Sequence, residues 1–190
     1  MNREEWLTAL MHALAPMCEE QLHGSTGNIA TWRVSVGFPG GGAKCKTIGQ
    51  CWSSTASKDG HTEIFISPVL GTAQEVDHVL LHEMVHASLG IKEGHGKAFG
   101  RMARGLGLEG KLTATTCGVA LRERLNQITE ALGPYPHASL NLAESGRKKQ
   151  TTRLLKASCP DCGYTVRLTQ KWVDKGLPVC PCGEEMELAQ

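Results

Sequence analysis

The chain has 190 residues, a net charge of +1 and a hydrophobic fraction of 41%, values typical of one globular domain of moderate size with a small satellite. They exclude a fibrous, a wholly disordered and a polycationic protein. No stretch approaches the ~20 apolar residues of a membrane span, and the N-terminus lacks the basic start and apolar run of a signal peptide. We therefore expect a cytoplasmic protein without a membrane partner.

The first half of the chain predicts one helix followed by strands. Residues 3–22 place apolar side chains at three- and four-residue spacing, which predicts an amphipathic helix despite Pro16. Alternating apolar residues predict strands over 32–38 and 62–67, and a further short strand over 47–53.

Helices dominate the next part of the chain. Thr72-Ala-Gln-Glu75 is a capping-box pattern, and it opens an apolar-periodic segment that stops at Gly90. Two further helices are predicted over 96–106 and 118–132. A stretch with two prolines and a run of basic residues follows. The domain boundaries that we expect are 1–135 for the first domain, 136–153 for a basic linker and 154–190 for the second domain.

The helix that ends at Gly90 contains the central motif, His82-Glu83-Met84-Val85-His86, which matches H-E-x-x-H. On a helix, the i, i+4 spacing puts both imidazoles on one face, close enough to share a metal ion. Glu83 lies beside them and is placed to act as a general base that later returns its proton to a leaving amine. The pattern therefore predicts a zinc-dependent peptidase with Glu83 as its catalytic residue.

A catalytic zinc usually has three protein ligands and one open position, so a third ligand is required. The metzincin pattern fails, because Leu89 and Lys92 stand where it needs glycine and histidine. Glu109 and Glu123 are formal candidates on later segments. His95 is nearer, and the glycines on either side of it allow a tight turn back to the helix.

The sequence HEMVHA, followed nine residues after His86 by HGKAF, resembles the SprT-like metallopeptidases, whose pattern is HExxH, a short loop and HGxxF. Residues 48–52 and 63–68 are similar to two strands of that family, and the resemblance covers about residues 5–185. It implies that His95 is the third ligand of a catalytic zinc. It also implies that the strand 64–67 is a sheet edge that binds an extended peptide; an ordinary internal strand is the alternative.

Four of the eight cysteines form two close pairs near the C-terminus. Their spacing is near that of a zinc ribbon, in which four thiolates hold one structural zinc. The second pair is C-x-C where C-x-x-C is usual, so His137 or another cysteine is an alternative ligand. The predicted ligands are Cys159, Cys162, Cys180 and Cys182. The fold class we expect is thus α+β, with a small antiparallel or mixed sheet packed on zincin-type helices, followed by a small four-cysteine zinc-ribbon subdomain.

Positive charge gathers around the linker and the ribbon, since residues 145–178 hold eight Lys or Arg against two Asp. Interleaved aromatic residues offer stacking surfaces for bases, although a solvated basic face is the alternative. SprT-like proteins include DNA-dependent proteases that cleave proteins crosslinked to DNA, so the resemblance favours DNA, single-stranded or partly so, as a partner. The residues that we expect to contact it are Arg147, Lys148, Lys149, Arg167, Lys171 and Trp172.

Three functions therefore compete. The first is an endopeptidase for DNA-associated or DNA-crosslinked proteins, with one catalytic and one structural zinc and a role in DNA repair. The second is a nucleic-acid-binding accessory protein with little or no peptidase activity, and the third is a peptidase for an ordinary cellular target. The intact Glu83 favours an enzyme, because a structural zinc site needs no carboxylate there. The first function would place the protein at the nucleoid of a cell or in the host cytoplasm of a virus.

Overall fold

The computed structural model describes residues 1–22, 29–44, 46–144 and 154–188. The chain divides into two compact units, Met1–Ala143 and Glu144–Gln190. Within the described ranges it forms α-helices and small β-sheets, which confirms the predicted α+β class. None of the helices in these ranges is long and apolar enough to cross a membrane.

Helix α1 (Arg3–Gln21) opens the first unit where a helix is predicted. A capping box fixes its start: the Glu5 N–H donates to the Asn2 side chain at 2.9 Å, and the Asn2 N–H donates to the Glu5 carboxylate at 2.8 Å. Pro16 lies inside the helix. The inner face of α1 is fully buried in the main core, with Trp6 only 1% exposed.

The main sheet contains strands β1 (Trp32–Val36), β2 (Gly49–Trp52) and β3 (Thr62–Ile66) in the order β1-β3-β2. Strand β1 runs parallel to β3 and β2 runs antiparallel to it, so the sheet is mixed. The expectation that the strand 64–67 is a sheet edge is therefore wrong, because β3 is paired on both sides. The edge strand beside the predicted metal site is β2.

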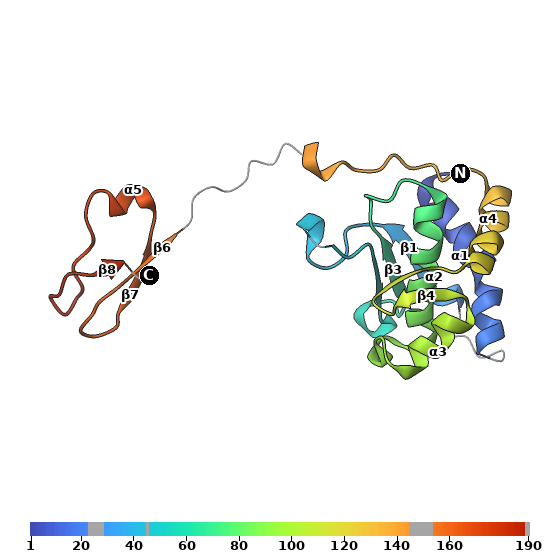
Figure 1. Cartoon of the computed structure of the whole chain (residues 1–190), viewed down its shortest axis with the longest axis horizontal. Coiled ribbons are helices and arrows are strands. Elements are labelled where there is room, and N and C mark those ends of the chain that lie inside the picture. Colours follow the sequence, from blue (N-terminus) through green and yellow to red (C-terminus); the bar gives the residue numbers. More distant parts are fainter. Residues whose placement is uncertain (23–28, 45, 145–153, 189–190) are drawn as a thin grey trace. The chain divides into compact units, whose positions relative to one another are not determined.

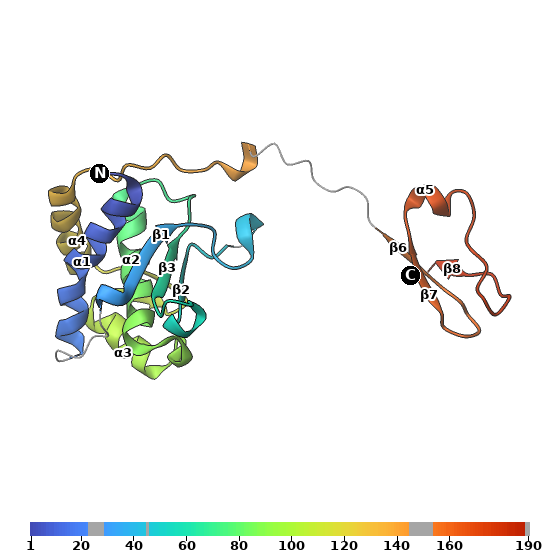
Figure 2. The same cartoon turned by 180° about the vertical axis from the view of Figure 1, so that it is seen from behind.

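Helix α2 (Ala73–Leu89) lies in the interior of the first unit (Figure 1). It packs against β2 and β3 on one side and against the other helices elsewhere. Figure 2 shows the sheet in front of this helix. The predicted capping box of Thr72 and Glu75 is present, and Gly90, with φ of 85°, ends the helix. This arrangement covers most of α2. The face that carries His82 and His86, called the metal-motif face below, lies beside β2.

The rest of the first unit packs around α2. Helix α3 (Lys97–Gly105) and helix α4 (Val119–Leu132) occur where helices are predicted. Between them β4 (Leu108–Lys111) and β5 (Ala114–Cys117) form an antiparallel hairpin, which contacts α2 through β5. The hairpin was not predicted, since its residues are mostly polar and do not alternate clearly.

Short 3-10 turns complete the described ranges of the first unit and its C-terminal boundary: Ile29–Thr31, Gly42–Lys44, Ser54–Ala56, Ile91–Glu93 and Leu142–Glu144. After α4 the chain returns along the loop that follows β3. There the Leu140 N–H donates to the Pro68 carbonyl at 2.8 Å, and a ring nitrogen of His137 lies 3.0 Å from the same oxygen.

The second unit is a small sheet with the strand order β7-β6-β8. It contains β6 (Leu155–Ser158), β7 (Thr165–Leu168), the short helix α5 (Gln170–Val173) and β8 (Glu187–Leu188). Among the described residues of this unit, the buried core consists of Ala157, Cys159, Cys180 and Met186. So small an apolar core is typical of units that an additional constraint, such as a metal, helps to hold together.

Candidate metal centre and cleft

Three imidazoles converge at the N-terminal end of α3. His82 and His86 lie one turn apart on α2, and His95 lies in the turn before α3. The Nε2 atom of His95 is 3.2 Å from Nε2 of His82 and 3.2 Å from Nε2 of His86. Tetrahedral zinc with Zn–N bonds of about 2.0–2.1 Å separates its ligand nitrogens by about 3.3 Å. The three side chains therefore fit a zinc ion.

The other candidates for a third ligand lie elsewhere. Neither Glu109 nor Glu123 belongs to the imidazole cluster or to the lining of the adjoining cleft. His95 reaches the cluster because the chain turns sharply there, and Gly94 has a φ of 50° that favours glycine.

The ring of Phe99 packs against all three imidazoles. Its centroid lies 4.9 Å from that of His82, 4.5 Å from His86 and 4.8 Å from His95. Phe99 has no exposed surface. This apolar support excludes water from one side of the cluster and limits the orientations that the rings adopt.

Burial also sets the protonation of these rings. Burial, together with the smaller effect of the neighbouring imidazoles, lowers the pKa of His82 to about 3 and that of His86 to about 4. The pKa of His95 is lowered by burial as well. Neutral imidazoles have a free lone pair, which is the form that binds a metal.

Glu83 lies between the imidazoles and strand β2. It is only 6% exposed, and this burial raises its pKa to about 7, while a hydrogen bond from the backbone of Cys51 acts in the opposite direction. A carboxyl group with a pKa near neutrality suits a general base.

Room for the Glu83 carboxylate comes from Gly49 on β2. A Cβ atom at Gly49 would lie 2.6 Å from Oε1 of Glu83 and 2.7 Å from a methyl carbon of Val79, closer than real Cβ contacts. The glycine is thus required by this close approach and not by its backbone conformation. It fixes how near β2 comes to α2.

A cleft of about 710 Å³ adjoins the cluster. It is lined by residues 46–51 of β2 and the loop before it, by the metal-motif face of α2, by the turn before α3 and by residues 113–115 of the hairpin. His78, one turn before His82, belongs to this lining. Tyr135 has a hydroxyl that is chemically suited to stabilise an oxyanion, but it does not line the cleft. Its ring packs on Trp6, with ring centroids 4.9 Å apart.

The hairpin supplies a partner for His82 that the sequence did not indicate. Oγ1 of Thr115 lies 2.9 Å from Nδ1 of His82. The two residues are 33 positions apart, so no local pattern connects them.

Asp77, His78 and Cys117 form another group of metal-ligating residue types, and His78 of this group lines the cleft. Arg122 already engages the group, because its guanidinium donates to the Asp77 carboxylate at 2.6 Å and to Sγ of Cys117 at 3.0 Å. A cation in the same place would be repelled by the guanidinium. The group is therefore an ion-pair network and not a metal site.

The four C-terminal cysteines form a second cluster, in which each residue offers a sulfur atom within 4.8 Å of the others. Sγ of Cys159 lies 3.5 Å from that of Cys182, and Sγ of Cys162 lies 3.4 Å from that of Cys180. Zn–S bonds of about 2.3 Å place tetrahedral sulfurs about 3.8 Å apart. The set therefore fits zinc, and it includes both members of the C-x-C pair. His137 is hydrogen-bonded in the first unit.

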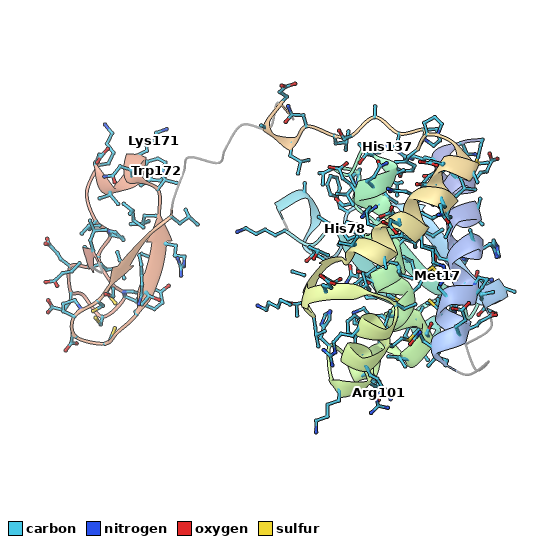
Figure 3. All side chains as sticks on the ribbon, turned by 45° about the vertical axis from the view of Figure 1, so that its right-hand side comes forward. Met17, His78, Arg101, His137, Lys171 and Trp172 are labelled. Atoms are coloured by element: carbon cyan, nitrogen blue, oxygen red, sulfur yellow. The ribbon has the colours of Figure 1, made fainter. Side chains whose placement is uncertain are left out.

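The structure describes only some of the residues that we expect to contact nucleic acid. Arg147, Lys148 and Lys149 lie outside the described residues. Lys171 and Trp172 lie on α5 (Figure 3), with Nζ of Lys171 5.3 Å from the centroid of the Trp172 ring. The remaining residue of the set, Arg167, is exposed on β7. The Trp172 side chain is 57% exposed, which is unusual for so large an apolar group.

Comparison with known proteins gives one match. The sequence model of the SprT-like family matches residues 11–118, which is more than half of the chain and includes the helix α2 and the turn before α3. No curated protein and no solved structure matches the chain.

Proposed function

This chain belongs to the SprT-like family, and we propose that it is a zinc-dependent endopeptidase that acts on DNA-associated or DNA-crosslinked proteins. The observation that carries the proposal is the convergence of three imidazoles, with Nε2 of His95 3.2 Å from Nε2 of both His82 and His86, beside a buried carboxylate with a raised pKa. Three ligands and an adjacent base are the parts that a hydrolytic zinc site needs.

In this proposal His82, His86 and His95 hold the catalytic zinc. The ion, when bound, supplies a Lewis acid that polarises the scissile carbonyl and lowers the pKa of water. Glu83 takes a proton from the attacking water and returns it to the leaving amine, so it is the catalytic residue. Its burial favours this role, because a carboxyl group with a pKa near 7 both accepts and releases a proton near neutral pH.

The substrate chain is proposed to bind along strand β2. This strand is an edge of the sheet, and its residues line the cleft next to the imidazoles. An extended peptide can add to such an edge through main-chain hydrogen bonds, which would carry a scissile bond past Glu83. Binding by main-chain groups tolerates many sequences and suits a protease that removes unrelated proteins.

The second unit is proposed to hold a structural zinc on its four cysteines and to engage DNA. Four thiolates leave no open coordination position, so this ion would stabilise the fold and not react. The exposed ring of Trp172 with the neighbouring ammonium of Lys171 offers a base-stacking surface beside a phosphate contact. The basic residues of the segment before β6 would add sequence-independent affinity. DNA-bound substrates would place the enzyme in the cytoplasm, at a nucleoid or in the host of a virus.

The test is cleavage of a DNA-binding protein by the full chain loaded with zinc, with and without single-stranded DNA. Glu83→Gln is the control, because it removes the base and leaves all three imidazoles. We expect cleavage by the wild-type chain in the presence of DNA and a loss of at least about 10²-fold in Glu83→Gln. Tight DNA binding and two bound zinc ions without cleavage that depends on Glu83 would favour the nucleic-acid-binding accessory protein. Cleavage that depends on Glu83 but not on DNA would favour an ordinary cellular target.

A further inference from the structure

The hairpin of β4 and β5 contacts α2 at two points along the helix, both of them through β5. The half-buried residues of β5 meet α2 one after the other: Thr115 contacts His82, and Cys117 lies beside Asp77. Two residues of a strand span about 6.7 Å, and five residues of a helix span about 7.5 Å. Strand β5 can therefore touch α2 at both points at once, which fixes the hairpin along the helix axis.

One end of the hairpin is anchored by an ion pair between the buried Asp77 and the partly exposed Arg122. Asp77 on α2 has no exposed surface, and Arg122 on the first turn of α4 donates to it at 2.6 Å. The same guanidinium donates to Sγ of Cys117 at the end of β5. A buried carboxylate without its partner is strongly unfavourable, so this contact holds α2, α4 and the hairpin together. The anchor lies five residues before His82 on the same helix.

At the contact between Thr115 and His82, the orientation of the His82 ring determines which of the two residues donates the hydrogen bond. Its Nε2 faces Nε2 of His95, so a ring that binds a metal through Nε2 must carry its proton on Nδ1. Oγ1 of Thr115, 2.9 Å away, is then the acceptor. The χ1 angle of a threonine in a strand is restricted, so this hydroxyl is held in place before any metal binds.

We propose that Thr115 is a positioning residue that fixes the tautomer and the ring orientation of His82, with the hairpin as its rigid support. The inference rests on the proposed function in one respect, that His82 is a zinc ligand. Because a hydroxyl is neutral, Thr115 orients the imidazole without adding a negative charge to the site. A carboxylate in this position would also have oriented the ring, at the cost of altering the charge near Glu83.

The experiment measures zinc affinity of the full chain by competition with a chelator of known affinity. Thr115→Val has nearly the same shape but no hydroxyl, and Thr115→Ser keeps the hydroxyl. The adjacent Thr116 is exposed and faces away from α2, so Thr116→Val is a matched control for strand propensity. We expect a ten- to hundredfold weaker affinity at the histidine site in Thr115→Val. Affinity near the wild-type value is expected in the other two variants, with the cysteine site unchanged in all three.

A second measurement does not depend on the metal. Long-range proton–nitrogen NMR spectra of the zinc-free chain distinguish a neutral imidazole protonated on Nδ1 from one protonated on Nε2. His82 should be protonated on Nδ1 in the wild-type chain and in Thr116→Val, and should lose that preference in Thr115→Val.

The outcomes separate this inference from the proposed function. If the wild-type chain binds two zinc ions and Thr115→Val matches Thr116→Val in affinity and tautomer, Thr115 has no positioning role, while the proposed metal centre stands. Equal weakening in Thr115→Ser and Thr115→Val would also overturn the inference, because the hydroxyl would not be responsible. A wild-type chain that binds a single zinc, held by its cysteines, would overturn both.

Discussion

The ring of Phe99 packs against that of His86 in a tilted arrangement, with centroids 4.5 Å apart and an angle of 33° between the ring planes. Phe99 follows His95 by four residues on the first turns of α3, and it is completely buried. One side chain thereby links the helix that carries two of the imidazoles to the segment that carries the third. Phe99 therefore contributes both to the stability of the fold and to the geometry of the imidazole cluster.

Shortening Phe99 should therefore affect both properties. We expect Phe99→Ala to lower the free energy of unfolding by about 3–5 kcal/mol, because it leaves a cavity under three imidazoles. Phe99→Leu should fold, at a smaller cost, but should bind zinc less tightly at the histidine site, since a branched aliphatic side chain supports flat rings poorly. Denaturant unfolding and chelator competition measure the two effects. Wild-type zinc affinity in Phe99→Leu would show that the ring contributes to the core alone.

Gly49 should be essential for activity without binding the metal. The methyl group of Gly49→Ala would lie 2.6 Å from Oε1 of Glu83, so either the carboxylate or strand β2 must move. A displacement of about 1 Å at a catalytic group costs on the order of 10²-fold in rate. We expect that loss in peptide cleavage with both zinc ions retained. Gly37→Ala, whose methyl group would meet Phe65 instead, is the control and should cleave normally. Equal activity in the two variants would contradict the prediction.

The capping box of α2 should make stability depend on pH. Hydrogen bonds from the Gly71 N–H, the Thr72 hydroxyl and the Thr72 N–H lower the pKa of Glu75 from its usual value of 4.5. Because the folded pKa is the lower one, this carboxylate stabilises the fold above pH 4.5 and ceases to do so as the pH falls through the folded value.

Two variants test the capping box. Thr72→Ala should cost about 1 kcal/mol at neutral pH. Glu75→Gln should be less stable than wild type at pH 7, and the difference should shrink when unfolding is measured near pH 3. A difference that stays constant with pH would mean that the charge of Glu75 is not involved.

Cys182 should be as necessary for the second zinc as the other three cysteines. Its sulfur lies 3.5 Å from that of Cys159, although the C-x-C spacing departs from the usual ribbon pattern. We expect Cys182→Ser to lose one of two zinc ions and to expose residues 154–188 to protease, because the apolar core of this unit is too small to persist alone. Asp161→Asn, an exposed change between two of the cysteines, should retain both ions. Two zinc ions in Cys182→Ser would require another ligand.

Local patterns in the sequence were sufficient for the four helices of the first unit and for the pairs of metal-binding residues, although not for the short helix α5. The capping box and apolar period of α2, and the i, i+4 spacing of His82 and His86, depend only on helix geometry, and the α+β class follows from such segments. The close cysteine pairs likewise appear within a few residues of one another.

Only the tertiary structure decided which distant residues meet. Sequence alone left His95, Glu109 and Glu123 open as the third side chain, and the packing of α3 through Phe99 brings His95 to the other imidazoles. Strand order is a long-range property too, so an alternating segment could not reveal that β3 is central and β2 is the edge. The contact of Thr115 with His82 and the close approach of Gly49 to Glu83 likewise join elements far apart in the chain. They arise from side-chain packing between elements, which has no periodic signature in the sequence.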